Sequence, residues 1–519
     1  MSSNQQGELL TEVRTKFYLD SVALMRHSRA LASREGVIEA AMMMGTPANR
    51  EIMQNAGLLD AASPAAGGGD LVISIRATSL AVAREAVTAA DELLEKPATV
   101  GSGSEWRPRS IRSAVAMQPD ANLVLISVAG DFAVSEARKA LRRGLHAMIF
   151  SDNVSIQAEV ELKQEARSLG RIVMGPDCGT SIINGVPLAF ANKLPRGAIG
   201  IVGASGTGIQ EVSCLIAANG QGISHAIGVG GRDLKSEVGG LSTLMALEAL
   251  GRDDQTQQIV LISKPPADKV VEKILPVIAT IGKPVVLCFV GGSEPVGIPA
   301  GVTFTNTLKA AAEAATATQL QTRKHDIASL VKEFSPSRKR VIGLYCGGTL
   351  CAEAQVILSQ QETAVASNVA IPGVQDSAGE LLAVPDCHVL SDLGDDRFTR
   401  GRPHPMIEPS IRDDALGSAL SSPDVAVVLL DVVIGYGAHA DPAGQIAGVL
   451  QHSGWDNNGP LVIASVTGTV DDPQNLSRQE EILARAGVLV TESNADAVAL
   501  GMTAVRSVRA TSDPVGSPA

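Results

Sequence analysis

Short apolar runs recur along the chain and are separated by alanine-rich segments of helical character. Clear examples are "DLVISIRA", "NLVLISVA", "AIGIVGA", "QIVLISK", "PVVLCFV" and "VAVVLLDVV". The runs are unbroken instead of alternating with polar residues, which is typical of strands that are buried on both faces. Strands that alternate with helices predict serial βα units and parallel sheets. The pattern therefore predicts an α/β protein built on parallel sheets.

Changes in composition divide this pattern into three parts. A chain of 519 residues is too long for a single hydrophobic core. One junction is predicted at "NKLPRGA", residues 192–198, and a polar linker at "KEFSPSRKR", residues 332–340. We therefore expect three domains, at residues 10–192, 196–325 and 338–508.

Composition and charge exclude several classes of function. The net charge is −12, and no basic stripe is interleaved with aromatic residues, so nucleic acid is not an expected partner. No run of about 18 apolar residues predicts a membrane span, and the first residues lack a signal-peptide pattern, so we expect a cytoplasmic protein. The six cysteines never have C-x-x-C spacing, which argues against a disulfide framework and against a metal site.

Two glycine-rich turns open the second and third expected domains. They are "IGIVGASGTGIQE" at 199–211 and "IGLYCGGTLCAE" at 342–353, and in both a glutamate follows the threonine by four residues. The first N–H groups of a helix are unpaired, and the helix dipole adds about half a positive charge, so each turn is predicted to bind an oxyanion. The lysine of a P-loop and the third glycine of a dinucleotide fold are missing. The alternative is a helix N-cap by Ser205 or Thr207, with Thr207 and Gln210 at capping-box spacing.

Longer motifs resemble a known family. The stretch "MGPDCGTSIINGVPLAFANKLPRGAIGIVGASGTGIQE" resembles the α subunit of succinyl-CoA synthetase. Likewise, "LSDLGDDRFTRGRPHPMIEP" and "VAVVLLDVVIGYGAHADPA" resemble the carboxy-terminal domain of its β subunit. The whole chain resembles the FdrA family, in which these two pieces are fused. The resemblance implies a CoA-binding-type, Rossmann-like N-terminal domain followed by two flavodoxin-like parallel-sheet domains.

The resemblance also implies a phosphate site. In succinyl-CoA synthetase, the Ser-Gly-Thr helix and a matching helix of the other subunit point their N-termini at a phosphorylated histidine. The corresponding phosphate-binding residues here are Ser205, Gly206, Thr207, Gly208, Gly347, Gly348 and Thr349. The segment that matches the synthetase's histidine loop, "PVVLCFVGGSEPVGIPAGVTF", contains no histidine, and Lys264 stands in place of the glutamate that supports it. No ATP-grasp domain precedes the third domain. Phosphate is therefore expected as a free substrate or within an acyl phosphate, without a nucleotide.

Charged residues follow a predicted strand end in "DDRFTRGRPHP", where open parallel sheets bind ligands. Arg402 is a candidate for clamping an anion, His404 for moving a proton near neutral pH, and Lys264 for balancing charge. The alternatives are a surface lysine before a Pro-Pro turn and a structural histidine between prolines. The candidate substrate-binding residues are Asp396, Arg400, Gly437 and His439.

The FdrA resemblance implies a function. It indicates a subunit of oxamate carbamoyltransferase in allantoin and purine degradation, which converts oxalurate and phosphate to oxamate and carbamoyl phosphate together with companion subunits. No cofactor is then required, although CoA binding stays possible. Two alternatives are CoA-dependent acyl transfer, as in an acyl-CoA synthetase or phosphotransacylase, and a scaffold or regulatory protein without catalysis.

Overall fold

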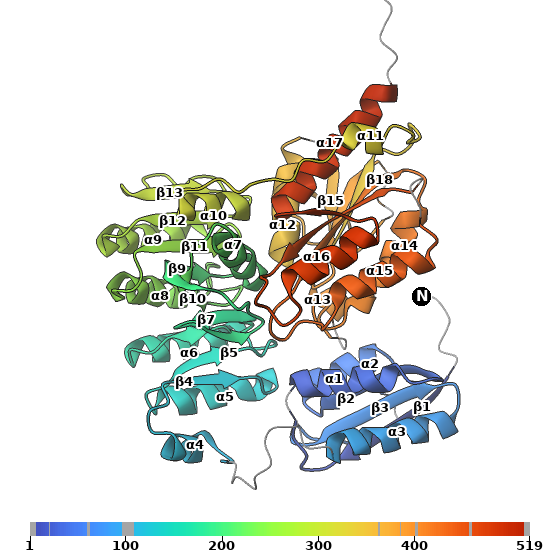
Figure 1. Ribbon diagram of the computed structural model, residues 1–519. Coiled ribbons are helices and arrows are strands. Elements are labelled where there is room, and N and C mark those ends of the chain that lie inside the picture. Colours follow the sequence, from blue (N-terminus) through green and yellow to red (C-terminus); the bar gives the residue numbers. More distant parts are fainter. Residues whose placement is uncertain are drawn as a thin grey trace, which may run out of the picture. The chain divides into compact units, whose positions relative to one another are not determined.

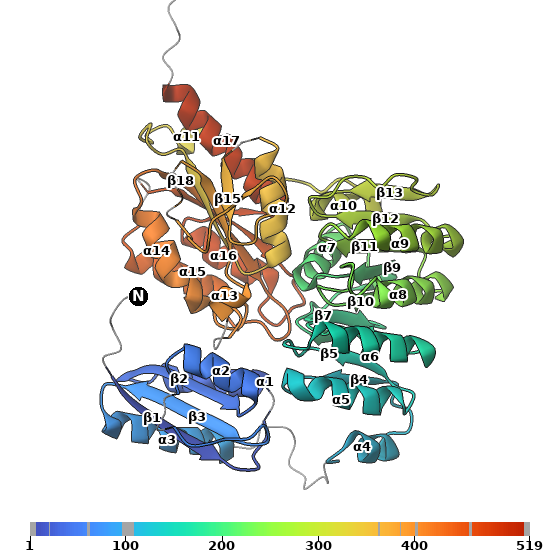
Figure 2. The same cartoon turned by 180° about the vertical axis from the view of Figure 1, so that it is seen from behind.

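The computed structural model describes residues 7–19, 21–59, 63–95, 108–361, 364–382, 384, 386–399, 403–455 and 459–512. The chain divides into two compact units, residues 1–177 with 400–403 and residues 178–399 with 404–519. Figures 1 and 2 show the helices and strands of both units from two opposite sides. Among the described residues, no helix is both long enough and apolar enough to cross a membrane.

The first unit begins with a small antiparallel sheet, in the strand order β1-β3-β2. Its strands are β1 (Glu8–Arg14), β2 (Val37–Met44) and β3 (Leu71–Ala77), and its helices are α1 (Ser21–Ala32), α2 (Pro47–Asn55) and α3 (Leu80–Glu95). The prediction of a parallel sheet is wrong for this segment. The run "DLVISIRA" forms β3, and every residue of β3 is buried. Ile73 belongs to the core with residues of α1 and α3, whereas Val72 clusters with Met53 of α2. Because both faces are covered, an antiparallel strand also shows an unbroken apolar run.

The first unit also contains a parallel sheet in the order β4-β5-β6. Its elements are α4 (Ile111–Met117), β4 (Leu123–Ile126), α5 (Gly130–Leu141), β5 (His146–Ile149), α6 (Ile156–Ser168) and β6 (Val173–Met174). Ala133 and Ala137 of α5 and Leu162 of α6 form its core with the strands. The expected domain at 10–192 therefore holds two complete sheets, of which the second has the parallel, Rossmann-like character that the sequence predicts, whereas its residues 180–189 pair into a sheet of the second unit.

The second unit contains two sheets of seven strands each, and the first has the order β13-β12-β11-β9-β10-β7-β8. The strands β9 to β13 are parallel, and the hairpin of β7 and β8 pairs antiparallel with β10 at one edge. The strands are β7 (Thr180–Ile183), β8 (Val186–Ala189), β9 (Arg196–Gly203), β10 (Ile223–Gly228), β11 (Gln258–Ser263), β12 (Val285–Phe289) and β13 (Val302–Thr305). The helices are α7 (Gly206–Ala218), α8 (Leu241–Arg252), α9 (Asp268–Ile281) and α10 (Leu308–Thr316).

The second seven-stranded sheet is entirely parallel, in the order β16-β15-β17-β14-β18-β19-β20. Its strands are β14 (Arg340–Tyr345), β15 (Val365–Ser367), β16 (Gln375–Asp376), β17 (His388–Asp392), β18 (Val425–Val433), β19 (Leu461–Thr467) and β20 (Leu489–Thr491). The helices are α11 (Ile327–Leu330), α12 (Gly348–Ser359), α13 (Asp396–Thr399), the 3-10 helix η1 (Pro409–Arg412), α14 (Asp413–Ser421), α15 (Pro442–His452), α16 (Leu476–Arg485) and α17 (Asn494–Ser512). The predicted α/β class with parallel-sheet domains is confirmed.

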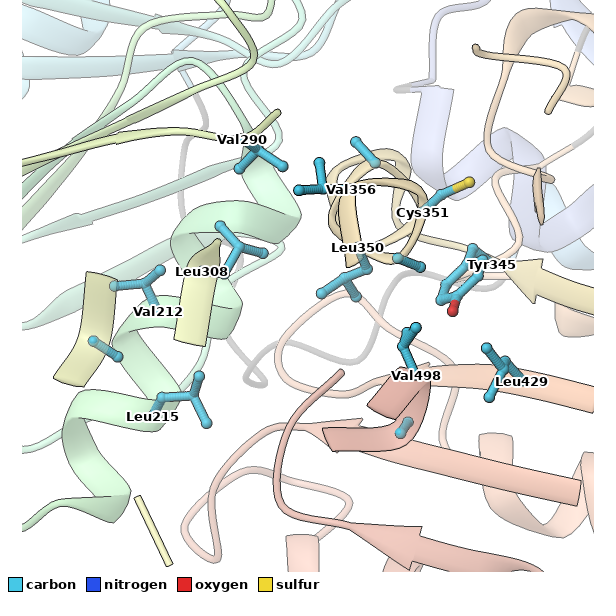
Figure 3. Close-up of a cluster of buried hydrophobic side chains, with 14 of the residues drawn as sticks. Val212, Leu215, Val290, Leu308, Tyr345, Leu350, Cys351, Val356, Leu429 and Val498 are labelled. Carbon is cyan, nitrogen blue, oxygen red and sulfur yellow. The ribbon is translucent and has the colours of Figure 1, made fainter. Parts of the chain in front are cut away.

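One hydrophobic cluster joins the two seven-stranded domains. Val212 of α7 and Leu308 of α10 belong to the same buried cluster as Leu350 of α12 and Val498 of α17. Figure 3 shows Val212 and Leu308 on one side of this cluster and Leu350 and Val498 on the other. Because interiors are close-packed, the shared core fixes the position of α7 relative to α12.

Candidate functional site

The first glycine-rich turn caps α7 with a serine. The backbone of Ser205 is extended, and its side-chain Oγ accepts a hydrogen bond from the Gly208 N–H at 2.9 Å. Gln210 does not complete a capping box, because its Nε2 donates to Asn192 Oδ1 at 3.0 Å. In the part of the chain that the structure describes, no acceptor pairs with the N–H groups of Gly206 and Thr207. This helix start therefore keeps two donors for an anion.

The second glycine-rich turn is fixed by a buried carboxylate. Asp431 of β18 accepts hydrogen bonds from the N–H groups of Cys346 and Gly347, both at 2.7 Å. The guanidinium of Arg412 donates to the main-chain oxygen of Asp431 at 2.8 Å and lies 3.4 Å from its Oδ1. Burial raises the pKa of Asp431, and the Arg412 charge opposes that shift. With two N–H groups held by Asp431, the next donors of the turn are those that begin α12.

The two helix starts meet at their first residues. Ser205 Oγ lies 2.5 Å from Thr349 Oγ1, within hydrogen-bond distance. A Cβ placed on Gly347 would lie 3.0 Å from the Thr207 methyl group, so these two residues are also in contact. The N–H groups of Gly348 and Thr349 have no acceptor among the described residues, as is the case at α7. The structure thus brings residues of both predicted phosphate-binding turns to one place.

Lys264 lies beside these helix starts. It directly follows β11, which is the neighbour of β9 in the sheet, and Ala204 N–H donates to Ile262 O across the two strands at 2.9 Å. The side chain is exposed. Its charge acts on two groups of the other domain, since it lowers the pKa of Asp392 and of Cys351 against the larger effect of their burial. Lys264 therefore supplies positive charge near the start of α12.

Asp392 is a residue of this site that the sequence analysis did not select. It is the last residue of β17 and is 6% exposed. Its Oδ1 accepts a hydrogen bond from the Gly394 N–H at 2.9 Å, and its Oδ2 lies 2.5 Å from the position that a Cβ on Gly348 would take. Burial raises the pKa of Asp392 to about 7, while Lys264 acts in the opposite direction. Its position at the carboxyl end of a predicted parallel strand was a signal that could have identified it.

His404 and Asp392 both lie close to Gly394. A Cβ on Gly394 would lie 2.6 Å from His404 Nε2 and 3.1 Å from Asp392 Oδ1. The other ring nitrogen, Nδ1, accepts a hydrogen bond from the Met406 N–H at 3.2 Å, which leaves the proton on Nε2. The residue is only partly buried, yet loss of water around the ring lowers the pKa of His404 to about 4. The expectation that His404 titrates near neutral pH is therefore wrong, because its surroundings favour the neutral ring.

The loop after β18 lies against the segment that follows β8. A Cβ on Gly437, whose φ is +80°, would lie 2.8 Å from the Phe190 ring, so this close approach requires a glycine. The N–H of His439 donates to Met406 O at 2.7 Å. The Phe190 ring is 6.5 Å from the His404 ring. The structure therefore places Gly437 and His439 on the same side of the site as His404.

The remaining candidates are not joined to this group by the structure. Asp396 is exposed at the start of the four-residue helix α13. Arg400 and Arg402 lie outside the described residues. Their proposed roles in binding substrate stay predictions.

Two buried glutamates connect the domains in a reciprocal way. Glu211 of α7 accepts hydrogen bonds from Thr467 Oγ1 at 2.5 Å and from the Asn494 N–H, at the start of α17, at 3.2 Å. Glu353 of α12 accepts from the Leu308 N–H, at the start of α10, at 2.6 Å and from Asn494 Nδ2 at 2.8 Å. Each glutamate thus caps the last helix of the opposite domain. This role explains the matching spacing of glutamate and threonine in the two turns.

Replacing Glu211 by glutamine is expected to make stability less dependent on pH. Burial, followed by repulsion from Glu353, raises the pKa of Glu211 from 4.5 to about 7 in the folded protein. The stability that the protonated carboxyl contributes is fully present below the pKa of the unfolded state. It is lost as pH rises through the pKa of the folded state. The free energy of unfolding should therefore fall between pH 5 and pH 8, by on the order of 1–3 kcal/mol from this group.

Chemical denaturation at these two pH values measures the effect. Glu211→Gln keeps the side-chain shape but cannot ionise, so the difference between the two pH values should shrink. Glu481→Gln is the control, because Glu481 is 59% exposed in its pair with Arg485. An undiminished pH effect in Glu211→Gln would show that this carboxyl does not titrate as described.

Comparison with known proteins identifies the domains. A CoA-ligase family model matches residues 344–504, and a CoA-binding domain model matches residues 196–291. The latter match lies in the second expected domain, whereas we had predicted a CoA-binding-type fold for residues 10–192. A third model, described as "AllF, heavy metal-associated domain", matches residues 7–108. That segment has no cysteine, so it lacks the thiolates that soft metals prefer.

The chain is 39% identical over 497 residues to the uncharacterised protein YahF of Escherichia coli (strain K12), which covers 93% of this chain and 96% of the relative. Among solved structures, it is similar to a dinucleotide-forming acetyl-coenzyme A synthetase 1 of Ca. Korarchaeum cryptofilum in complex with phosphate and ADP, at 15% identity and a TM-score of 0.29 over 76% of this chain and 85% of that one. It is also similar to the ATP citrate lyase of Methanothrix soehngenii in complex with citrate and coenzyme A, at 19% identity and a TM-score of 0.32 over 40% and 38% of the two chains.

The family models and the relative YahF identify the family of this chain. The matched domains occur in the order AllF-type domain, CoA-binding domain and CoA-ligase domain. This order agrees with a fused, succinyl-CoA synthetase-like architecture. With YahF as a relative over almost its whole length, the chain belongs to the FdrA family.

Proposed function

We propose that this protein is the subunit of a carbamoyltransferase that holds phosphate, and that it acts on oxalurate to give oxamate and carbamoyl phosphate. The observation that carries the proposal is the meeting of α7 and α12 at Ser205 and Thr349. Four N–H groups without acceptors among the described residues begin these helices, and Lys264 adds a positive charge beside them. Such a site suits a phosphate that is a substrate.

The absence of a phosphate carrier supports acyl phosphate chemistry. Residues 284–304, which match the loop that holds the catalytic histidine in succinyl-CoA synthetase, contain no histidine. His404, whose ring approaches Asp392, is kept neutral because loss of water around the ring lowers its pKa to about 4. Phosphate bound at the two helix starts would then attack the carbamoyl carbon directly, and Lys264 would balance the negative charge that develops. We propose that Arg402 and Arg400 contribute to binding the carboxylate of oxalurate.

A second candidate is CoA-dependent acyl transfer from an acyl phosphate. The matches to CoA-binding and CoA-ligase domains favour it. Both candidates use a phosphate at the helix starts and differ in the acceptor of the acyl group. A scaffold role, in which companion subunits perform the chemistry, is the third possibility, and it predicts no binding of phosphate. We propose a cytoplasmic protein that works with companion subunits and without a required cofactor.

The deciding experiment is an assay of the chain together with its co-expressed companion subunits. With oxalurate and inorganic phosphate, and without CoA or ATP, we expect carbamoyl phosphate and oxamate in equal amounts. Replacing phosphate by sulfate is the control, because sulfate fits an oxyanion site but yields no carbamoyl phosphate. Failure to form carbamoyl phosphate, together with thioester formation from an acyl phosphate and CoA, would favour the second candidate.

A further inference from the structure

The carboxyl group of Asp392 has one oxygen that is held and one that is not. Oδ1 accepts from the Gly394 N–H, and the backbone of Asp392 is fixed by the side chain of Asn368, whose Oδ1 and Nδ2 each make a hydrogen bond of 2.9 Å to it. Oδ2 points at the first residue of α12, Gly348, and has no hydrogen-bond partner among the described residues. A buried carboxyl group thus directs a free oxygen at the place where two helix starts offer free N–H groups.

The groups around Asp392 come from several elements. Lys264 after β11 is the charged group that favours the carboxylate form, whereas Asp431 of β18 and Asp395 disfavour it. The thiols of Cys346 and Cys351 are also near, and burial raises the pKa of both to values where they stay protonated. The ring of His404 adds no charge, as described above. Lys264 is therefore the cation that faces Asp392 in the part of the chain that the structure describes.

We propose that Asp392 is the catalytic proton-transfer residue of this site, giving its proton to the nitrogen of the leaving group and then taking a proton from the bound phosphate. The inference rests on the proposed function for the identity of that leaving group. The position of Oδ2 at the start of α12 carries it, since phosphate bound by the N–H groups there would lie next to this oxygen. A carboxyl whose pKa burial raises to about 7 has both protonation states available near neutral pH.

The proposed step balances without a further reactant. An oxygen of HPO₄²⁻ attacks the carbamoyl carbon of oxalurate, and the bond from that carbon to the oxamate nitrogen breaks. The nitrogen takes the electron pair of this bond and the proton of the Asp392 carboxyl. The Asp392 carboxylate then takes the proton that the attacking phosphate carried. The products are carbamoyl phosphate and oxamate, and Asp392 returns to its starting form.

The test compares Asp392→Asn with the wild type in the complete, co-expressed assembly. Asparagine keeps the hydrogen bond from Gly394 but cannot transfer the proton, so kcat/KM for carbamoyl phosphate formation should fall by about 10²–10⁴-fold. The wild-type rate should decrease above about pH 7 as Asp392 loses its proton, and this limb should be absent in the residual activity of the variant. Asp254→Asn removes an exposed carboxylate of the same kind and should change neither kcat/KM nor its dependence on pH.

Binding of sulfate gives a second measurement that needs no activity. Sulfate does not titrate in this range, so calorimetry at pH 6 and pH 8.5 reports on the protein. The wild type should bind sulfate more weakly at pH 8.5, because the Asp392 carboxylate then repels the anion, and Asp392→Asn should bind equally well at both values. Equal affinity of the wild type at both values would overturn the inference, as would unchanged kcat/KM in the variant. If the wild type forms no carbamoyl phosphate but shows the expected pH dependence of sulfate binding, the proposed substrate is wrong. The position of Asp392 beside the bound anion would still be supported.

Discussion

Replacing Arg412 by methionine is expected to lower the free energy of unfolding by about 3–5 kcal/mol. Arg412 is 2% exposed, and its partner Asp431 is fully buried. Without the guanidinium, a carboxylate would be left in the protein interior with no opposite charge, although it would still hold the N–H groups of Cys346 and Gly347. The turn that begins α12 should therefore loosen. A shift of the urea midpoint, followed by circular dichroism, measures the loss.

Two further variants separate this mechanism from simple loss of packing. In Arg412→Met combined with Asp431→Asn, the buried charge is removed as well, so part of the lost stability should return. Arg485→Ala breaks an arginine–carboxylate ion pair on the surface, where Arg485 is 78% exposed, and should change stability by less than about 1 kcal/mol. A double variant that is less stable than Arg412→Met would argue against an uncompensated Asp431 as the cause.

Gly348→Ala is expected to reduce kcat/KM for phosphate by about 10²–10³-fold, the loss typical of removing one hydrogen-bond donor to a developing charge. The added methyl group would lie 2.5 Å from Asp392 Oδ2, so either the carboxyl group or the start of α12 must move. Both changes would disturb the position at which we propose that phosphate and Asp392 meet. Steady-state kinetics at varied phosphate concentration measures the loss.

The matched control for this change is Gly417→Ala. Gly417 lies in α14, where an added Cβ meets nothing within 4 Å. Alanine favours a helix over glycine by about 1 kcal/mol, so this variant should be slightly more stable and fully active. If Gly348→Ala also retained full activity and phosphate affinity, the start of α12 would not be a phosphate site.

Local patterns in the sequence were sufficient for much of the fold. Apolar runs located strands such as β9, β11 and β18, and the glycine-rich turns marked the starts of α7 and α12. The same reasoning misjudged β3, because burial of both faces gives one pattern in parallel and antiparallel sheets alike. Strand direction depends on how segments pair, and this information is not present in a single run.

The candidate site was predicted less completely, for a related reason. The contact of Ser205 with Thr349 joins residues 144 positions apart, and that of Glu211 with Thr467 joins residues 256 positions apart. Contacts of this range leave no periodicity in the sequence, so only the similarity of the two turns and the resemblance to succinyl-CoA synthetase suggested that they act together. The pKa values depend on three-dimensional burial, which is why His404 was expected to titrate near neutral pH and Asp392 was overlooked. Binding of phosphate by both turns stays a prediction.

The reciprocal capping by Glu211 and Glu353 has a consequence for assembly. An interface that buries two carboxyl groups pays heavily for desolvation, and between separate polypeptides this cost would weaken association. Here residues 317–339 join the last helix of one domain to the first strand of the next. A short tether of this kind holds two partners at an effective concentration in the millimolar range. The two helix starts therefore stay together in a single molecule at any dilution, and their pairing does not depend on the amount of protein in the cell.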